Sequence, residues 1–257
     1  MTIDKPILLN VSEHVTIAYQ HLPGHSPGVI FLGGFMSDMT GTKAMALDVW
    51  CRQQGQAYLR FDYEGHGASS GRFEEGTIGR WMENALAVLD QLSEGPQILV
   101  GSSMGGWIML LLALARPERV AGLVGVACAA DFIEPMWQNF DEQTRAQLQR
   151  EGLVYLPSEY DAEAPYPVTL NLIEEARQHQ LLTGDKLAIH CPVRLLHGMR
   201  DPEVPWQTSA RVAEHLLSDD VQIVLVKDGE HRMSRAGDLN LLTDLIGAVS
   251  VATRRES

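Results

Sequence analysis

Short apolar runs alternate along this chain with longer segments in which apolar residues recur every three or four positions. A short run bounded by turn residues is typical of a buried strand, and the longer spacing is typical of an amphipathic helix. The pattern predicts two strands within residues 6–20 and further strands at 29–32, 58–61, 97–100, 120–127, 193–196 and 221–226. It predicts helices at residues 42–54, 77–92, 107–115, 206–217 and 239–251.

The alternation of strand and helix predicts an α/β fold with a mostly parallel central sheet and helices on both faces. The alternation of strand and helix stops at residues 132–182, where prolines and aromatic residues mix with acidic ones. Within this segment, short helices are predicted at 141–150 and 170–180. An insertion this long in a compact domain usually forms a lid or a binding surface. We therefore predict one domain over residues 1–257, with residues 132–182 inserted as a small cap.

A serine stands in a sharp turn at the centre of the chain. Residues 97–106 read QILVGSSMGG, an apolar run followed by the pattern G-x-S-x-G and then by a predicted helix. Strand, turn and helix form the context of a nucleophile elbow, where glycines flank a serine with a strained backbone. The pattern predicts Ser103 as a nucleophile and the amide of Met104 as one donor of an oxyanion hole.

A serine nucleophile needs a general base, and that base needs an orienting carboxylate. After such an elbow, the acid and then the histidine follow in chain order, each behind a late strand. Asp201 follows the predicted strand at 193–196, and His231 follows the strand at 221–226. We therefore predict Ser103, Asp201 and His231 as the catalytic residues. The alternatives for the acid are Glu203, Asp131 and Asp228.

The second donor of an oxyanion hole comes from the turn after the first central strand. The amide of Phe35 is the first choice there, with Gly34 or Met36 as alternatives if the turn has another register. Methionines and a tryptophan fall in or beside the predicted active-site loops, and such side chains suit an acyl chain. We predict Met36, Trp107 and Met199 as substrate-binding residues, with ordinary core packing as the alternative for each.

Composition narrows the possible partners. The net charge of −13 disfavours nucleic acid, and no apolar stretch reaches the ~18 residues of a membrane span. Three widely spaced cysteines and a start without targeting features indicate a reducing compartment, and we expect a cytoplasmic protein, monomeric or homodimeric. The chain contains no H-E-x-x-H, G-x-x-x-x-G-K-[ST] or G-x-G-x-x-G motif, so we predict neither a metal nor a cofactor.

Several strings together resemble the α/β-hydrolase superfamily across nearly the whole chain. These are GGF at 33–35, DYEGHGASSG at 62–71, GSSMGG at 101–106, HGMRD at 197–201 and GEH at 229–231. Further strings are similar to the mitochondrial abhydrolases that act as palmitoyl-protein thioesterases and acyl-glucuronide esterases. They include SPGVIF at 26–31, GTKA at 41–44, RFDY at 60–63, RLLHGM at 194–199 and VPW at 204–206.

The resemblance implies serine esterase or thioesterase activity, with Ser103, Asp201 and His231 at the triad positions. The implied substrate is a small acyl ester or thioester, or an acylated protein. One feature departs from the pattern: no mitochondrial transit sequence precedes Met1, so we expect a bacterial cytosolic relative. The alternatives are a carbon–carbon bond hydrolase with the same triad and a non-catalytic ligand-binding member, against which the complete set of three residues argues.

Overall fold

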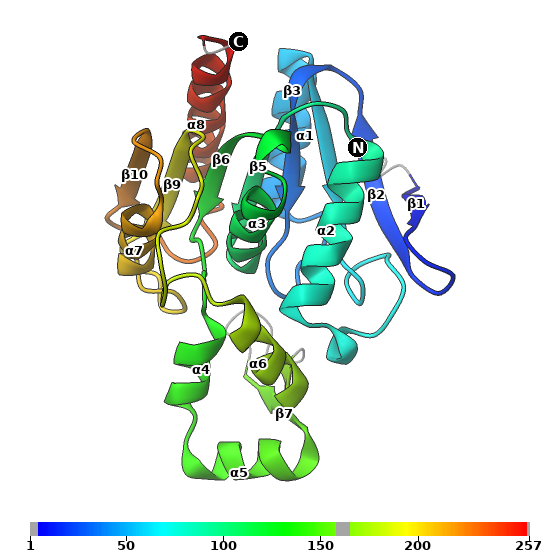
Figure 1. Cartoon of the computed structure of the whole chain (residues 1–257), viewed down its shortest axis with the longest axis vertical. Helices are drawn as coiled ribbons and strands as arrows, with labels where there is room; N and C mark the ends of the chain where they lie inside the picture. The colour runs from blue at the N-terminus through cyan, green and yellow to red at the C-terminus, as the bar shows by residue number, and fades with distance from the viewer. Residues whose placement is uncertain (1–4, 158–164, 256–257) are drawn as a thin grey trace.

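The computed structural model describes residues 5–157 and 165–255. Its centre is an eight-stranded sheet (Figure 1). The strands are β1 (Ile7–Asn10), β2 (Thr16–Leu22), β3 (His25–Leu32), β4 (Gln56–Phe61), β5 (Gln97–Ser102), β6 (Val120–Val126), β9 (Val193–Gly198) and β10 (Val221–Val226). Their order in the sheet is β1-β2-β4-β3-β5-β6-β9-β10.

The sheet is parallel from β4 to β10, as the alternation of strands and helices predicts. The two strands at the amino-terminal edge differ, because β1 pairs antiparallel with β2 and β2 pairs antiparallel with β4. No helix intervenes between β1 and β2 or between β2 and β3. The carboxyl ends of the parallel strands therefore share one edge of the sheet, where the predicted active-site turns meet.

Helices cover both faces of the sheet. The helices α2 (Ile78–Leu92), α3 (Met104–Ala115) and α7 (Gln207–His215) pack on one face, and α1 (Thr42–Gln54) and α8 (Ala236–Arg255) pack on the other (Figure 1). The buried apolar residues accordingly form two clusters, one on each face. Strand β5 has all six residues buried, as expected for a strand with helices on both sides.

Local sequence explains where these helices begin and end. The side chain of Thr77 accepts a hydrogen bond from the amide of Arg80 and so caps the start of α2. Helix α1 is followed by the capping residue Gly55, whose φ of 66° is accessible to glycine without strain. Helix α3 ends two residues before Pro117. Short 3₁₀ turns lie at Phe73–Glu75, Pro117–Arg119 and Arg177–His179.

Residues 132–182, which we call the inserted segment, lie between β6 and β9. They contain the helices α4 (Ile133–Asn139), α5 (Glu142–Glu151) and α6 (Leu170–Ala176), and the antiparallel pair of β7 (Leu153–Leu156) and β8 (Tyr166–Thr169). Figure 1 shows these elements beyond the carboxyl end of β6, with α5 farthest from the sheet. The sequence predicted helices near α5 and α6 but neither α4 nor the β7–β8 pair. Residues 158–164 of the predicted cap lie outside the described residues.

Within residues 5–157 and 165–255, no helix has the length and apolarity needed to cross a membrane.

Candidate functional site

Ser103 stands at the junction of β5 and α3 with φ 54° and ψ −120°, a conformation that L-residues rarely adopt. The flanking glycines allow this turn because they have no Cβ atom where the backbone is closely packed. A Cβ atom on Gly101 would overlap the backbone of Gly105, and one on Gly105 would overlap the carbonyl groups of Leu32 and Gly33. The elbow therefore lies directly against the end of β3.

Three predicted residues meet at this elbow. His231 Nε2 lies 2.9 Å from Ser103 Oγ, and His231 Nδ1 lies 2.7 Å from Asp201 Oδ2. Because a carboxylate only accepts hydrogen bonds, Nδ1 carries the proton of the neutral imidazole, and Nε2 accepts from the Ser103 hydroxyl. The residues come from three separate turns after β5, β9 and β10, and they form one continuous hydrogen-bonded chain.

Asp201 is held on both carboxylate oxygens. The amides of Glu203 and Val204 donate to Oδ1 at 2.9 and 2.8 Å, and His197 Nε2 lies 3.1 Å from Oδ2. Burial by itself would raise the pKa of the Asp201 carboxyl, but hydrogen bonds from His197 and His231 outweigh it and hold that pKa well below its usual range. These hydrogen bonds therefore favour the ionised form of Asp201.

The other candidate acids have different surroundings. Asp131, with φ 59°, accepts hydrogen bonds from the amides of Leu181 and Leu182 at 2.7–3.1 Å and so ties down the end of the inserted segment. The exposed Asp228 forms an ion pair with Arg235 at 2.8 Å. Glu203 approaches His231 from the Nε2 side, with Oε2 at 3.5 Å.

The predicted oxyanion-hole segments flank the serine. A Cβ atom added to Gly34 would lie 3.4 Å from Ser103 Cβ and 4.0 Å from its Oγ, so the turn after β3 passes beside the hydroxyl. The amide of Ser37 closes that turn by donating to the carbonyl of Gly34 at 3.2 Å. Met104 is the first residue of α3, where helix amides point outward and the helix dipole favours negative charge.

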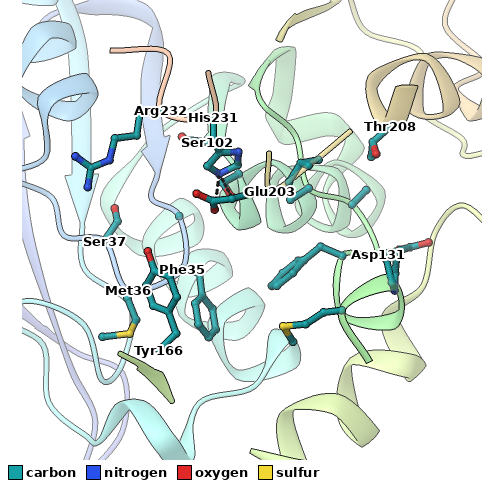
Figure 2. A pocket seen from close by; sticks show the side chains of 18 of the residues that line it. Phe35, Met36, Ser37, Ser102, Asp131, Tyr166, Glu203, Thr208, His231 and Arg232 are labelled. Atoms are coloured by element: carbon teal, nitrogen blue, oxygen red, sulfur yellow. Dashed lines mark hydrogen bonds and ion pairs between the residues drawn. The ribbon is translucent and has the colours of Figure 1, made fainter. Parts of the chain in front are cut away.

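A cavity of about 1110 Å³ opens in front of Ser103 and His231 and is bounded by the turn after β3 and the inserted segment (Figure 2). The Phe35 ring lies at its base, 6.0–6.1 Å from the rings of Phe132 and Tyr166 and 4.8 Å from Phe73. Its apolar lining consists mainly of Phe35, Met36, Phe132, Met136, Phe140, Leu156, Tyr166 and Val168. The cations Lys43, Arg211 and Arg232 also line it.

Of the three predicted substrate-binding residues, the structure brings one into this cavity. Met36 lies in its wall. Trp107 is fully buried, and its indole N–H donates to the carbonyl of His179 at 3.0 Å, because a buried indole needs an acceptor. Met199 is exposed and does not line the cavity. The expected roles of Trp107 and Met199 are therefore corrected: Trp107 ties α3 to the end of the inserted segment.

The histidine and glycine motif at residues 62–71 makes hydrogen bonds and ring contacts that shape its loop. The Asp62 carboxylate accepts hydrogen bonds from the amides of Met39 and Ala68 at 2.6 and 2.8 Å. His66 is buried against the rings of Tyr63, Phe73 and Trp81. In the described part of the chain, no cluster of three or more His, Cys, Asp or Glu side chains has an arrangement that could hold a metal ion.

Sequence reasoning missed one buried contact of the predicted triad and one group facing it. The sequence analysis assigns His197 no role in the site, yet it contacts the same Asp201 oxygen as His231. Glu203 was weighed only as a substitute for Asp201. Their positions within four residues of Asp201 were the available signal, but only the turn geometry shows that each faces the triad.

Comparisons with known proteins agree on one family. The family model described as serine aminopeptidase, S33, matches residues 27–163. The chain is 45% identical to the bovine protein named "Palmitoyl-protein thioesterase ABHD10, mitochondrial", over 91% of this chain and 78% of that protein. The structure of mouse α/β hydrolase domain-containing protein 10 superimposes with a TM-score of 0.88 at 43% identity, over 98% of this chain and all of that one.

A bacterial structure is similarly close. A crystal structure of a putative hydrolase from Agrobacterium vitis S4 superimposes with a TM-score of 0.89 at 40% identity, over 95% of this chain and 97% of that chain. These superpositions confirm the predicted α/β-hydrolase fold.

The expected cytoplasmic localisation is wrong, because relatives that are 45% identical to this chain over the aligned residues are named as mitochondrial proteins. The expectation drew on the few cysteines and on the first residues of the chain. A compartment is specified by a targeting segment that is distinct from the folded domain. The composition of the domain therefore does not decide where it works.

Proposed function

The chain belongs to the α/β-hydrolase superfamily, and from this premise we propose that it is a serine hydrolase that cleaves carboxylic thioesters or esters through an acyl-enzyme on Ser103. The observation that carries the proposal is the hydrogen-bonded chain from Ser103 through His231 to Asp201 beside a largely apolar cavity. Similar relatives are named thioesterases, which supports the reaction class.

In the first half of the reaction, Ser103 Oγ attacks the acyl carbonyl carbon while its proton passes to His231 Nε2. The tetrahedral intermediate then breaks its bond to the leaving sulfur or oxygen, which takes the proton from Nε2. The buried carboxylate of Asp201 stabilises the transient imidazolium and keeps the ring oriented through Nδ1. The product of this half is a thiol or an alcohol, and the acyl group stays on Ser103.

In the second half, a water molecule gives a proton to His231 Nε2 and attacks the acyl carbon. The proton returns to Ser103 Oγ as the carboxylic acid leaves. In both halves the negative carbonyl oxygen accepts hydrogen bonds from the amides of Met104 and Phe35, which we propose as the oxyanion hole. The turn after β3 runs beside Ser103, which supports this role for Phe35.

We propose that the inserted segment is a cap that holds the acyl chain. Phe132, Met136 and Phe140 come from its α4 region, and they face the cavity across from Phe35 and Met36. Apolar walls of this kind bury a hydrocarbon chain. Acyl-protein thioesters, small acyl thioesters and acyl-glucuronide esters are the candidate substrates.

The test is hydrolysis of a chain-length series of acyl esters and the matching thioesters by the wild type and Ser103→Ala. We expect turnover by the wild type and a loss of about 10³- to 10⁶-fold in kcat for the variant. The thioester-to-ester ratio of kcat/KM reports the preferred leaving group. A folded wild type that turns over no member of either series would contradict the proposal and favour carbon–carbon bond hydrolysis or ligand binding.

A pair of aspartate variants tests which carboxylate orients the base. Asp201→Asn should lower kcat by about 10³- to 10⁴-fold, because the amide places the wrong partner at His231 Nδ1. Asp131→Asn is the matched control, since Asp131 contacts the amides of Leu181 and Leu182 and not the imidazole. We expect its kcat to stay within about 10-fold of the wild type. The reverse order of effects would reassign the acid.

A further inference from the structure

Two carboxylates bracket the imidazole of His231, and both come from the turn after β9. Asp201 Oδ2 faces Nδ1 at 2.7 Å, and Glu203 Oε2 faces Nε2 at 3.5 Å. Figure 2 shows Glu203 beside His231. The two residues are also linked within the turn, because the backbone amide of Glu203 donates to Asp201 Oδ1 at 2.9 Å. The reaction described above uses Asp201 and leaves the Glu203 carboxylate without a role.

Four acidic side chains line the described part of the cavity, those of Asp38, Asp131, Glu134 and Glu203. Asp38 accepts a hydrogen bond from Thr40, Asp131 accepts from the amides of Leu181 and Leu182, and Glu134 accepts from Arg177. The Glu203 side chain is 32% exposed and lines the cavity next to His231. Its Oε2 lies 3.5 Å from Nε2 of the proposed base, His231.

The same ring nitrogen, His231 Nε2, contacts both Ser103 Oγ and the Glu203 carboxylate. A carbonyl carbon attacked by Ser103 therefore comes within a few ångströms of this negative charge. In a partly desolvated cavity, two like charges at such a separation repel more strongly than in water. The carboxylate product of hydrolysis carries its own charge at that position.

We propose that Glu203 determines specificity by charge: it disfavours acyl groups with a negative charge close to the scissile carbonyl and weakens retention of the carboxylate product. This inference rests on the proposed acyl-transfer function. The cavity also contains the cations Lys43, Arg211 and Arg232, which offset the charge of Glu203 at a distance. The effect of Glu203 is therefore confined to groups close to it. An anionic group farther from the scissile bond is therefore compatible with the site.

The matched variants are Glu203→Gln and Glu230→Gln. Both remove one negative charge from a loop at the active site, but Glu230 is exposed and does not line the cavity. The substrates are an activated butanoate ester and the corresponding succinate monoester, which has a carboxylate in place of the terminal methyl group. Glu203→Gln should raise the kcat/KM of the succinate ester relative to the butanoate ester by about 10-fold. Glu230→Gln should leave that ratio within about twofold of the wild type.

A binding measurement tests the inference without turnover. Octanoate and octanamide are titrated calorimetrically into Ser103→Ala, alone and combined with Glu203→Gln or Glu230→Gln. Loss of the Glu203 charge should tighten octanoate by about 5- to 10-fold and leave octanamide unchanged. Equal octanoate affinities with and without Glu203, or an equal gain from Glu230→Gln, would overturn the inference. Absence of ester turnover by the wild type would contradict the proposed function alone, because this titration would still decide the role of Glu203.

Discussion

His197 Nε2 lies 3.1 Å from Asp201 Oδ2, the same carboxylate oxygen that His231 Nδ1 approaches at 2.7 Å. The ring of His197 is fully buried, and its Nδ1 lies 2.7 Å from Ser209 Oγ. Because Asp201 and the carbonyl of Val204 both accept at Nε2, that nitrogen carries the proton and the Ser209 hydroxyl donates to Nδ1. His197 thus positions the carboxylate that orients His231.

Replacing His197 by phenylalanine keeps a ring in the core but removes the donor to Asp201. The carboxylate and the Val204 carbonyl each lose a partner, which should lower the free energy of unfolding by about 1–3 kcal/mol. We also expect kcat on a neutral ester to fall by roughly 10-fold or more, because Asp201 is less firmly held. Urea unfolding and steady-state kinetics measure both. His190→Phe, at an exposed position, is the control.

The two measurements together distinguish a positioning role for His197 from a role in core packing alone. A lower stability with an unchanged kcat would mean that His197 only fills the core. A fall in kcat at a temperature where the variant is fully folded would support its role in holding Asp201.

The elbow has no room for a side chain at Gly105, whereas Gly247 in α8 has open space around it. Gly105→Ala would drive a Cβ into the carbonyl groups of Leu32 and Gly33, so β3 and the turn after it would have to shift. We expect a loss of at least about 2 kcal/mol in the free energy of unfolding and a strong fall in kcat. Gly247→Ala in α8 is the matched control, because a Cβ there meets no atom within 4 Å.

Alanine at Gly247 should raise stability by about 0.5–1 kcal/mol, through the lower conformational entropy of the unfolded chain and the better helix propensity. Thermal unfolding of the two variants in parallel measures both effects. Opposite signs are expected, and a neutral Gly105→Ala would show that the elbow can move away from β3.

The elements of the fold and the meeting of Ser103, Asp201 and His231 could be predicted from sequence because their signals are local. A glycine pattern between strand and helix marks Ser103, and chain order points to Asp201 and His231. The order of strands and helices likewise predicts the parallel part of the sheet. These features depend on a few neighbouring residues and on the handedness of strand connections.

The errors arose where a prediction needed tertiary orientation. Trp107 lies in a helix that is apolar on every side, so periodicity does not tell which residues face the cavity and which face the core. Met199 follows the strand that precedes Asp201, but its side chain is exposed and does not line the cavity. The β7–β8 pair was missed because its strands have only four residues each, too few for a periodic signal.

Because of His66, the free energy of unfolding should decrease as the pH is lowered from neutral to mildly acidic. Burial lowers the pKa of His66 from 6.5 to about 4, although its Nδ1 contacts the carbonyl of Glu64. The folded state therefore favours the neutral ring. The stabilisation is complete above the unfolded value of 6.5 and is lost as the pH falls towards 4, because the unfolded chain then binds a proton that the folded one does not.

His66→Phe tests this dependence, because phenylalanine preserves the ring contacts with Phe73 and Trp81 and has no titrating group. The free energy of unfolding is measured by urea titration at pH about 7.5 and about 4.5. The wild type should lose about 2–3 kcal/mol more than the variant between the two conditions. Equal losses would show that His66 is solvated or paired in both protonation states.

The length of the acyl chain that the protein accepts should depend on Met136. Its side chain lines the cavity from α4, so Met136→Trp would fill space that a hydrocarbon chain otherwise occupies. Each methylene that is no longer buried costs about 0.8 kcal/mol, roughly a fourfold loss in kcat/KM. We expect the variant to lose activity on long acyl chains while a two-carbon ester is cleaved as before, which moves the chain-length optimum down by two or more carbons.

Gln149→Trp on the exposed side of α5 adds the same ring outside the cavity and should leave the optimum where it is. A uniform loss of kcat/KM at every chain length in Met136→Trp would mean that the tryptophan disturbs the Ser103–His231 geometry. An unchanged profile would mean that the acyl chain leaves the cavity by another wall. Only a loss that grows with chain length would show that the inserted segment limits the length of the acyl chain that the cavity accepts.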